Sequence, residues 1–109
     1  MEGTMYGMHS AHGEGRIVLD NDEDRKYCYM YYADNNGNPT ETYPYNPNGS
    51  QYGIAGLVSK NGRHMGLMPH PERCFLNWQL HWKPHSNNDA NNDSYSPWFK
   101  IFNNCYMNC

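Results

Sequence analysis

Two near-continuous apolar runs are the clearest feature of the hydrophobic pattern along this chain. They cover residues 54–59 and 64–68, and Lys60-Asn61-Gly62-Arg63 separates them. Asn-Gly between two apolar runs is the strongest short-range signal for a hairpin. The pattern therefore predicts a β-hairpin over residues 54–68.

Two further segments nearer the N-terminus have strand-like patterns. Residues 16–19, Arg-Ile-Val-Leu, are a short β-prone run, and residues 27–33 alternate along an extended chain. The alternation would place Cys28, Met30 and Tyr32 on one face and the intervening tyrosines on the other. We expect both segments to be strands.

Turn chemistry connects these strands to the rest of the chain. The acidic residues 20–24 predict a solvated turn. Residues 35–39 predict a second turn, in which Gly37 takes a positive φ and Pro39 begins a return strand over residues 40–43.

The C-terminal segment has the signature of a helix. Ser96 suits the N-cap and Pro97 the first helical position. An apolar face at helical spacing follows, made of Trp98, Ile101, Phe102, Cys105 and Tyr106. We expect this helix to run to the chain end.

Two polar segments are predicted to lack regular structure. Residues 44–50 hold two prolines and a glycine among Asn and Ser, which favours a fixed loop. Of residues 87–93, six of seven are Asn or Asp, so a polar low-complexity insertion is expected at about residues 86–95.

Composition limits the classes of partner. The formal net charge is -3 and the pI is near 6.0, which gives no electrostatic reason to expect nucleic acid. No apolar run approaches the ~20 residues that span a bilayer, and the first ten residues lack a signal-peptide pattern. We therefore expect a cytoplasmic protein without membrane contact, whose core draws on its ten Tyr and three Trp.

Cysteine and histidine spacing gives little support for metal or disulfide chemistry. None of the four cysteines forms a C-x-x-C pair, and without a secretory signal we expect free thiols. His81 and His85 have helical i, i+4 spacing, but Pro84 would disrupt the helix that this spacing requires. The prediction is that no metal site is present.

The strongest chemical signal is a histidine between two prolines at the end of the hairpin. Pro71 biases His70 toward an extended conformation, which would turn the side chains of His70 and Glu72 to the same side. A carboxylate beside an imidazole selects its tautomer and fixes its ring, as a general base requires. The alternative is a surface His–Glu pair of little consequence, since an isolated His-x-Glu is common.

Several motifs in order resemble one enzyme family. They are residues 12–16 (His-Gly-Glu-Gly-Arg), 43–50, 53–56, 66–73 (Gly-Leu-Met-Pro-His-Pro-Glu-Arg) and the helix start at 96–99. Together they are similar to the C-terminal part of the glutamine amidotransferase domain of formylglycinamidine ribonucleotide synthases. The resemblance implies an α/β fold: the C-terminal half of a class I amidotransferase open sheet, strand-rich, with a closing C-terminal helix. Residues 1–109 would form one partial glutaminase domain.

The resemblance also implies a reaction. In the family a cysteine attacks the side-chain amide of glutamine and forms a thioester, and the ammonia released passes to the synthetase domain of the same enzyme. His70 matches the catalytic histidine and Glu72 the catalytic glutamate. The ammonia would convert formylglycinamide ribonucleotide to the amidine. ATP and magnesium would bind elsewhere in the enzyme, and no cofactor is expected in this chain.

One family element has no counterpart here. The nucleophile of the family precedes the motif that begins at His12, and only eleven residues precede His12 in this chain. We do not expect any of its own thiols to replace it; these are Cys28, Cys74, Cys105 and Cys109. We therefore expect the chain alone to be unstable and inactive. The alternative is a non-catalytic binding or regulatory protein derived from this domain.

Two groups of motif residues keep two interpretations each. The first group would shape the site or the contact with the synthetase body, or would form a turn held by a local ion pair; it comprises His12, Glu14 and Arg16. The second would line the site, or would fix its loop through side-chain-to-backbone bonds; it comprises Asn46, Asn48 and Ser50. Arg73 is expected to be an ion-pair partner, and Trp78 and Trp82 to be packing residues.

Overall fold

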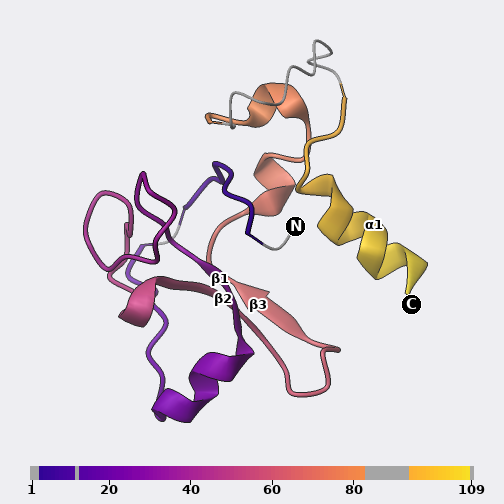
Figure 1. Ribbon diagram of the computed structural model, residues 1–109. Coiled ribbons are helices and arrows are strands. Elements are labelled where there is room, and N and C mark those ends of the chain that lie inside the picture. Colours follow the sequence, from indigo (N-terminus) through magenta and orange to yellow (C-terminus); the bar gives the residue numbers. More distant parts are fainter. Residues whose placement is uncertain (1–2, 12, 83–93, 109) are drawn as a thin grey trace. The chain divides into compact units, whose positions relative to one another are not determined.

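The computed structural model describes residues 3–11, 13–82 and 94–108 (Figure 1). Two compact units divide the chain: Ser10–Pro69 forms one, and Met1–His9 with His70–Cys109 forms the other. Most of the expected polar insertion lies outside the described residues, as do His12, His85 and Cys109. Within the described ranges, no helix is long and apolar enough to cross a membrane.

The Ser10–Pro69 unit is built on an antiparallel sheet of three strands in the order β1-β2-β3 (Figure 1). Its strands are β1 (Cys28–Tyr31), β2 (Ile54–Val58) and β3 (Met65–Leu67). The predicted hairpin is confirmed, because β2 pairs with β3 and Val58 lies opposite Met65. The hairpin turn uses the predicted Asn-Gly, with Gly62 at a φ of 69°.

The centre of this unit lies on the second strand. Ile54 and Ala55 are fully buried, and Tyr32, just after β1, is buried as well. Close packing across the sheet depends on Gly56, since a Cβ there would lie 3.0 Å from the ring of Tyr29. The core of this unit is therefore small, and the aromatic contribution expected from the composition is only partly present, since Tyr32 is buried but Tyr29, Tyr43 and Tyr45 are exposed.

The alternation predicted for residues 27–33 is only partly correct. The strand forms, but its pairing with β2 shifts register between Cys28 and Met30 and again between Met30 and Tyr31. Each shift twists the strand and reorients the following side chain. The two regular faces expected from the sequence are therefore interrupted.

Two predicted strands do not form. Residues 16–19 are held through the Ser50 and Gln51 segment: the N–H of Ile17 donates to Ser50 Oγ at 3.0 Å, and the N–H of Leu19 donates to Gln51 Oε1 at 2.9 Å. One backbone bond, from the N–H of Gln51 to the carbonyl of Ile17 at 3.0 Å, joins the same segments, but side-chain acceptors take the place of a regular ladder. The described chain is less rich in strand than predicted for this reason.

The second missing strand and the acidic turn also differ from the prediction. The expected return strand at 40–43 is reduced to one isolated bridge between Ala33 and Pro39, although Gly37 has the predicted positive φ of 83°. The acidic segment becomes the start of a 3₁₀ helix, Asp22–Tyr27, rather than an open turn.

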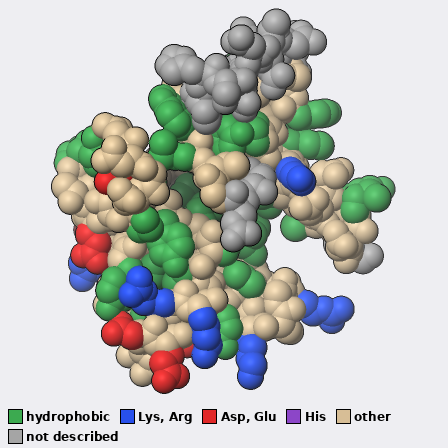
Figure 2. All heavy atoms as spheres, in the orientation of Figure 1, with side chains coloured by type: hydrophobic (Ala, Val, Ile, Leu, Met, Phe, Trp, Pro, Cys, Tyr) green, Lys and Arg blue, Asp and Glu red, His purple; other side chains and the backbone are tan. Residues whose placement is uncertain are grey.

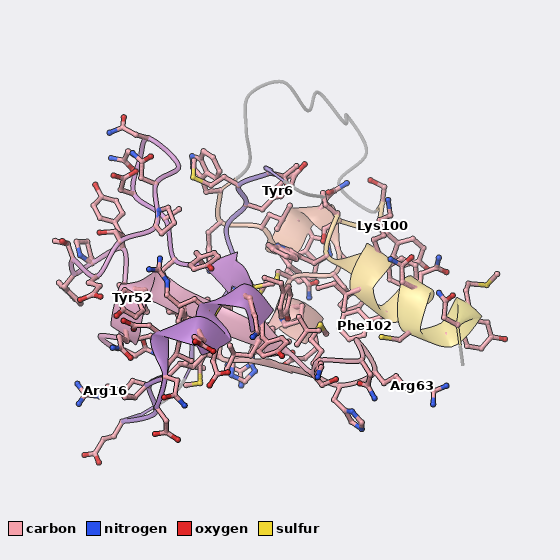
Figure 3. All side chains as sticks on the ribbon, turned by 60° about the horizontal axis from the view of Figure 1, so that its bottom comes forward. Tyr6, Arg16, Tyr52, Arg63, Lys100 and Phe102 are labelled. Carbon is pink, nitrogen blue, oxygen red and sulfur yellow. The ribbon has the colours of Figure 1, made fainter. Side chains whose placement is uncertain are left out.

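The second unit contains α1 (Phe99–Met107) and two short 3₁₀ turns, Pro71–Arg73 and Asn77–Gln79. The helix begins two residues later than predicted, with Trp98 rather than Ser96 at the N-cap, although Ser96 Oγ accepts the N–H of Trp98 at 3.2 Å. Most of the expected apolar face is nevertheless open to solvent. Lys100 and Phe102 leave α1 on opposite sides (Figure 3), and Phe102 and Tyr106 are both exposed.

The tryptophans of this unit differ sharply in burial. Trp98 is buried and donates its Nε1–H to the carbonyl of Gly7 at 3.0 Å. Trp78 and Trp82 are 59% and 46% exposed, so the packing role expected for them is wrong for this chain. Trp78 lies within the 3₁₀ turn Asn77–Gln79 and Trp82 follows that turn, so neither is on the face of a long helix.

Candidate active site

His70 lies three residues beyond the end of β3, at the entry to the Pro71–Arg73 turn. Its backbone N–H donates to the carbonyl of His9 at 2.7 Å, and its own carbonyl accepts the N–H of Arg73 at 3.2 Å. Pro71 supplies the first residue of the turn and has no N–H to satisfy. The main chain of His70 is therefore held on both sides.

The predicted pairing of His70 and Glu72 is present. Nδ1 of His70 lies 2.7 Å from Oε1 of Glu72, and the two side chains are 32% and 56% exposed. A carboxylate can only accept, so it selects the tautomer in which Nδ1 carries the hydrogen. Nε2 then keeps its lone pair and can accept a proton from a neighbouring group.

The route to this pairing differs from the one expected from the sequence. His70 is outside the helical region, with φ −111° and ψ 88°, but is not fully extended, and Glu72 lies inside the 3₁₀ turn rather than in an extended chain. The turn brings the carboxylate back toward the imidazole. Local backbone geometry, and not strand alternation, makes the contact.

Electrostatics keep the Glu72 carboxylate ionised. Its pKa lies below the ordinary value of 4.5, because its own backbone N–H and then the side chain of His70 stabilise the charged form. Nε of Arg73 lies 4.0 Å from the same carboxylate, which confirms Arg73 as an ion-pair partner. Since both groups are exposed, that pair adds little stability.

The described cysteines are not joined in disulfides, and two of them are poorly suited to attack a substrate. The thiol of Cys74 is buried, points at the carbonyls of His70 and Pro71 at 3.5 and 3.6 Å, and has a pKa raised by burial. Burial likewise raises the pKa of Cys28. Cys105 is exposed on α1. A reactive cysteine instead needs a lowered pKa and access to substrate.

The loop at residues 46–50 is fixed by its own side chains. Asn46 is only 2% exposed; its Nδ2 donates to the carbonyls of Thr40 and Ser50, and its Oδ1 accepts the N–H of Gly49 at 2.9 Å. Asn48 Nδ2 donates to the carbonyl of Gly15 at 3.0 Å. The loop-fixing interpretation is confirmed for Asn46, Asn48 and Ser50.

The earlier motif and the charge distribution add no second site. Among the residues described, Glu14 and Arg16 are exposed and form no ion pair with each other, so the interpretation of a turn held by a local ion pair is wrong for these two.

No group of three or more potential metal ligands occurs in the described ranges. On the face drawn in Figure 2, basic side chains do not gather into one patch, and acidic ones lie among them.

Sequence reasoning missed one histidine near the site. His9, whose carbonyl accepts the N–H of His70, carries an imidazole that contacts His81. The only signal available in the sequence was its position just before the 12–16 motif.

Comparison with known proteins decides the family. The whole chain, residues 1–109, matches the CobB/CobQ-like glutamine amidotransferase domain. The chain belongs to this glutamine amidotransferase family. A probable phosphoribosylformylglycinamidine synthase, chloroplastic/mitochondrial, of Arabidopsis thaliana is 48% identical over 95% of the chain. The phosphoribosylformylglycinamidine synthase of Dictyostelium discoideum is 43% identical over all of it.

This amidotransferase chain spans only 8% and 9% of those two relatives. A shorter relative, the phosphoribosylformylglycinamidine synthase subunit PurQ of Pseudothermotoga lettingae, is 53% identical over 67% of the chain, which spans 31% of that subunit. The resemblance inferred from the motifs is therefore confirmed. The described sheet and helix agree with an α/β fold at this coarse level.

Proposed function

We propose that this chain supplies the proton-transfer half of a glutaminase centre in a phosphoribosylformylglycinamidine synthase. His70 is the general base and Glu72 orients it. The supporting observation is the 2.7 Å contact between Nδ1 of His70 and Oε1 of Glu72, which leaves Nε2 as the acceptor. The proposed fold is the C-terminal half of a class I amidotransferase sheet.

In this mechanism Nε2 of His70 takes the proton of a cysteine thiol as the sulfur attacks the glutamine side-chain amide. The imidazolium then gives its proton to the departing ammonia, and a thioester remains. His70 next takes a proton from water, whose oxygen attacks the thioester; the carbon–sulfur bond breaks, glutamate is released, and the imidazolium returns its proton to the thiolate. The Glu72 carboxylate stabilises the imidazolium at each stage.

The thiol belongs to another part of the enzyme in this proposal. Cys74 is directed at backbone carbonyls and its pKa is raised, so it does not meet the requirement for a nucleophile. A synthetase domain of the same enzyme would receive the ammonia and use ATP and magnesium to form the amidine. Because this chain contributes only proton transfer, we expect it to hydrolyse no glutamine by itself.

The test uses the complete synthase that carries these residues, with glutamate release as the assay. Replacing a general base lowers the rate about 10²- to 10⁴-fold, which is the loss expected for His70→Asn. Glu72→Gln should cause a smaller loss, since the imidazole remains. Both variants should still form the amidine when ammonium salt replaces glutamine, because free ammonia bypasses the glutaminase step.

His64→Asn is the matched control, since it removes an exposed histidine of the hairpin region and should leave glutamate release unchanged. If His70→Asn releases glutamate at the normal rate, the proposed function is wrong. A role as a non-catalytic binding or regulatory protein would then take its place.

A further inference from the structure

A pair of histidines lies on the segments that flank His70. Nε2 of His81 is 3.2 Å from Nδ1 of His9, and the two ring centroids are 4.1 Å apart. Nε2 of His9 lies 3.4 Å from the carbonyl oxygen of Gln79. Both nitrogens of His9 are therefore engaged within one compact unit of the chain.

The chemistry of the acceptor fixes the direction of these bonds. The carbonyl of Gln79 can only accept, so Nε2 of His9 carries the hydrogen. In neutral His9 the other nitrogen, Nδ1, is then an acceptor, and Nε2–H of His81 donates to it. In the neutral state, His81 thus donates to His9, and His9 donates to the backbone carbonyl of Gln79.

The main chain of His9 connects these side-chain hydrogen bonds to the candidate base, His70. The carbonyl of His9 accepts the N–H of His70 at 2.7 Å. Two residues earlier, Gly7 is held to the same segment by its N–H to the carbonyl of Trp82 at 3.1 Å. The segment of residues 7–9, whose carbonyl at His9 binds His70, is thus held by a backbone bond at Gly7 and by the side chain of His9.

We propose that His9 and His81 are positioning residues for His70; this rests on the proposed function of His70 as the base. Their imidazoles fix the backbone of residue 9, whose carbonyl sets the main-chain position of His70 and hence the aim of Nε2. A general base must be held within about 0.5 Å of its productive position. The base itself is partly exposed, so its alignment depends on this backbone support.

The test is a set of substitutions at residues 9 and 81 in the complete synthase. His81→Leu removes the donor, whereas His81→Gln keeps an N–H that can reach His9. His9→Leu removes the anchor but keeps the carbonyl that binds His70. The rate of glutamate release is divided by the number of active sites, counted by stoichiometric labelling of the catalytic thiol with an electrophilic glutamine analogue.

We expect His81→Leu to lower kcat per active site about threefold to tenfold, the range given by loss of one neutral hydrogen bond. The KM for glutamine should stay within about twofold, and His81→Gln should restore most of the rate. Because both residues act through one series of hydrogen bonds, the His9→Leu/His81→Leu double variant should be no slower than the slower single variant.

Counting active sites separates this role from a purely structural one, which would lower the number of sites and not the rate at each. His64→Leu, which removes an exposed histidine elsewhere, is the control. A normal rate per site in His81→Leu, equal loss in His81→Gln, or multiplicative losses in the double variant would each overturn the proposal. These results leave the proposed function intact provided that His70→Asn is inactive; an active His70→Asn would overturn both.

Discussion

Replacing Asn46 by alanine is expected to loosen the 46–50 loop rather than to weaken glutamine binding. The side chain is 2% exposed and makes bonds in both directions, accepting the N–H of Gly49 at 2.9 Å and donating to the carbonyl of Ser50 at 2.9 Å. Alanine removes both capacities, so the Gly49 N–H loses its acceptor, whereas the Ser50 carbonyl still accepts the N–H of Gly53 at 3.1 Å. The perturbation is therefore expected to be local.

The magnitude follows from the bond to Gly49. Gly49 is exposed, so water can replace the lost acceptor, and loss of one such hydrogen bond costs about 0.5–1.5 kcal/mol, where each 1.4 kcal/mol is a factor of ten. Protection of the Gly49 amide against hydrogen exchange should therefore fall about 2- to 10-fold in Asn46→Ala. The Ser50 amide should lose less protection, because Oδ1 of Asn48 also accepts it at 3.0 Å.

Hydrogen exchange read by mass spectrometry on peptides that cover this loop is the assay, because it reports local opening even in a large protein. Asn48→Ala is the matched control; Asn48 is less buried than Asn46, so its loss should cost less protection. The reasoning is refuted if Asn46→Ala leaves the loop protected while raising the KM for glutamine, which would make Asn46 a substrate contact.

Three further results are expected. Gly53→Ala should destabilise the sheet unit by about 2–4 kcal/mol, because an L-residue at its φ of 73° is strained and a Cβ would lie 2.6 Å from a backbone oxygen; Gly37→Ala, with the same strain and open space, should cost only about 1–2 kcal/mol in chemical unfolding. Burial should make Cys74 react with iodoacetamide far more slowly than the exposed thiol on α1, and equal rates would contradict the packing described. The Glu72 carboxylate has a lowered pKa, so its pairing with His70 should persist as the pH falls to 4.5 and be lost only below it; a carbon-13 titration midpoint above 4.5 would refute this.

Local patterns in the sequence were sufficient for several elements. The Asn-Gly turn and its two apolar runs predicted the β2–β3 hairpin, since turn chemistry and adjacent strands act within fifteen residues. The prolines around His70 predicted that Glu72 would face it, although a 3₁₀ turn and not an extended chain makes the contact. Ser96 and Pro97 likewise predicted the start of α1 to within two residues.

Patterns failed where distant segments compete for the same backbone groups. Residues 16–19 looked like a strand, but the side chains of Ser50 and Gln51, more than thirty residues away, take up their N–H groups. Strand propensity reports fitness for a pleated surface, and it cannot say whether a partner strand is in reach. Aromatic residues raised the same difficulty, because Trp78 and Trp98 have the same side chain and opposite burial.

By itself, the sequence determined the family, the hairpin, the helix start and the identity of the His70–Glu72 pair. Each depends on residues that are close along the chain or on motifs that can be identified without knowledge of the fold. Only the tertiary structure decided that Asn46 holds its loop, that Cys74 points at backbone carbonyls, and that His9 lies against both His70 and His81. Contacts between residues sixty or more positions apart, like those of His9, leave no periodic trace in a single sequence, because they depend on how the whole backbone folds.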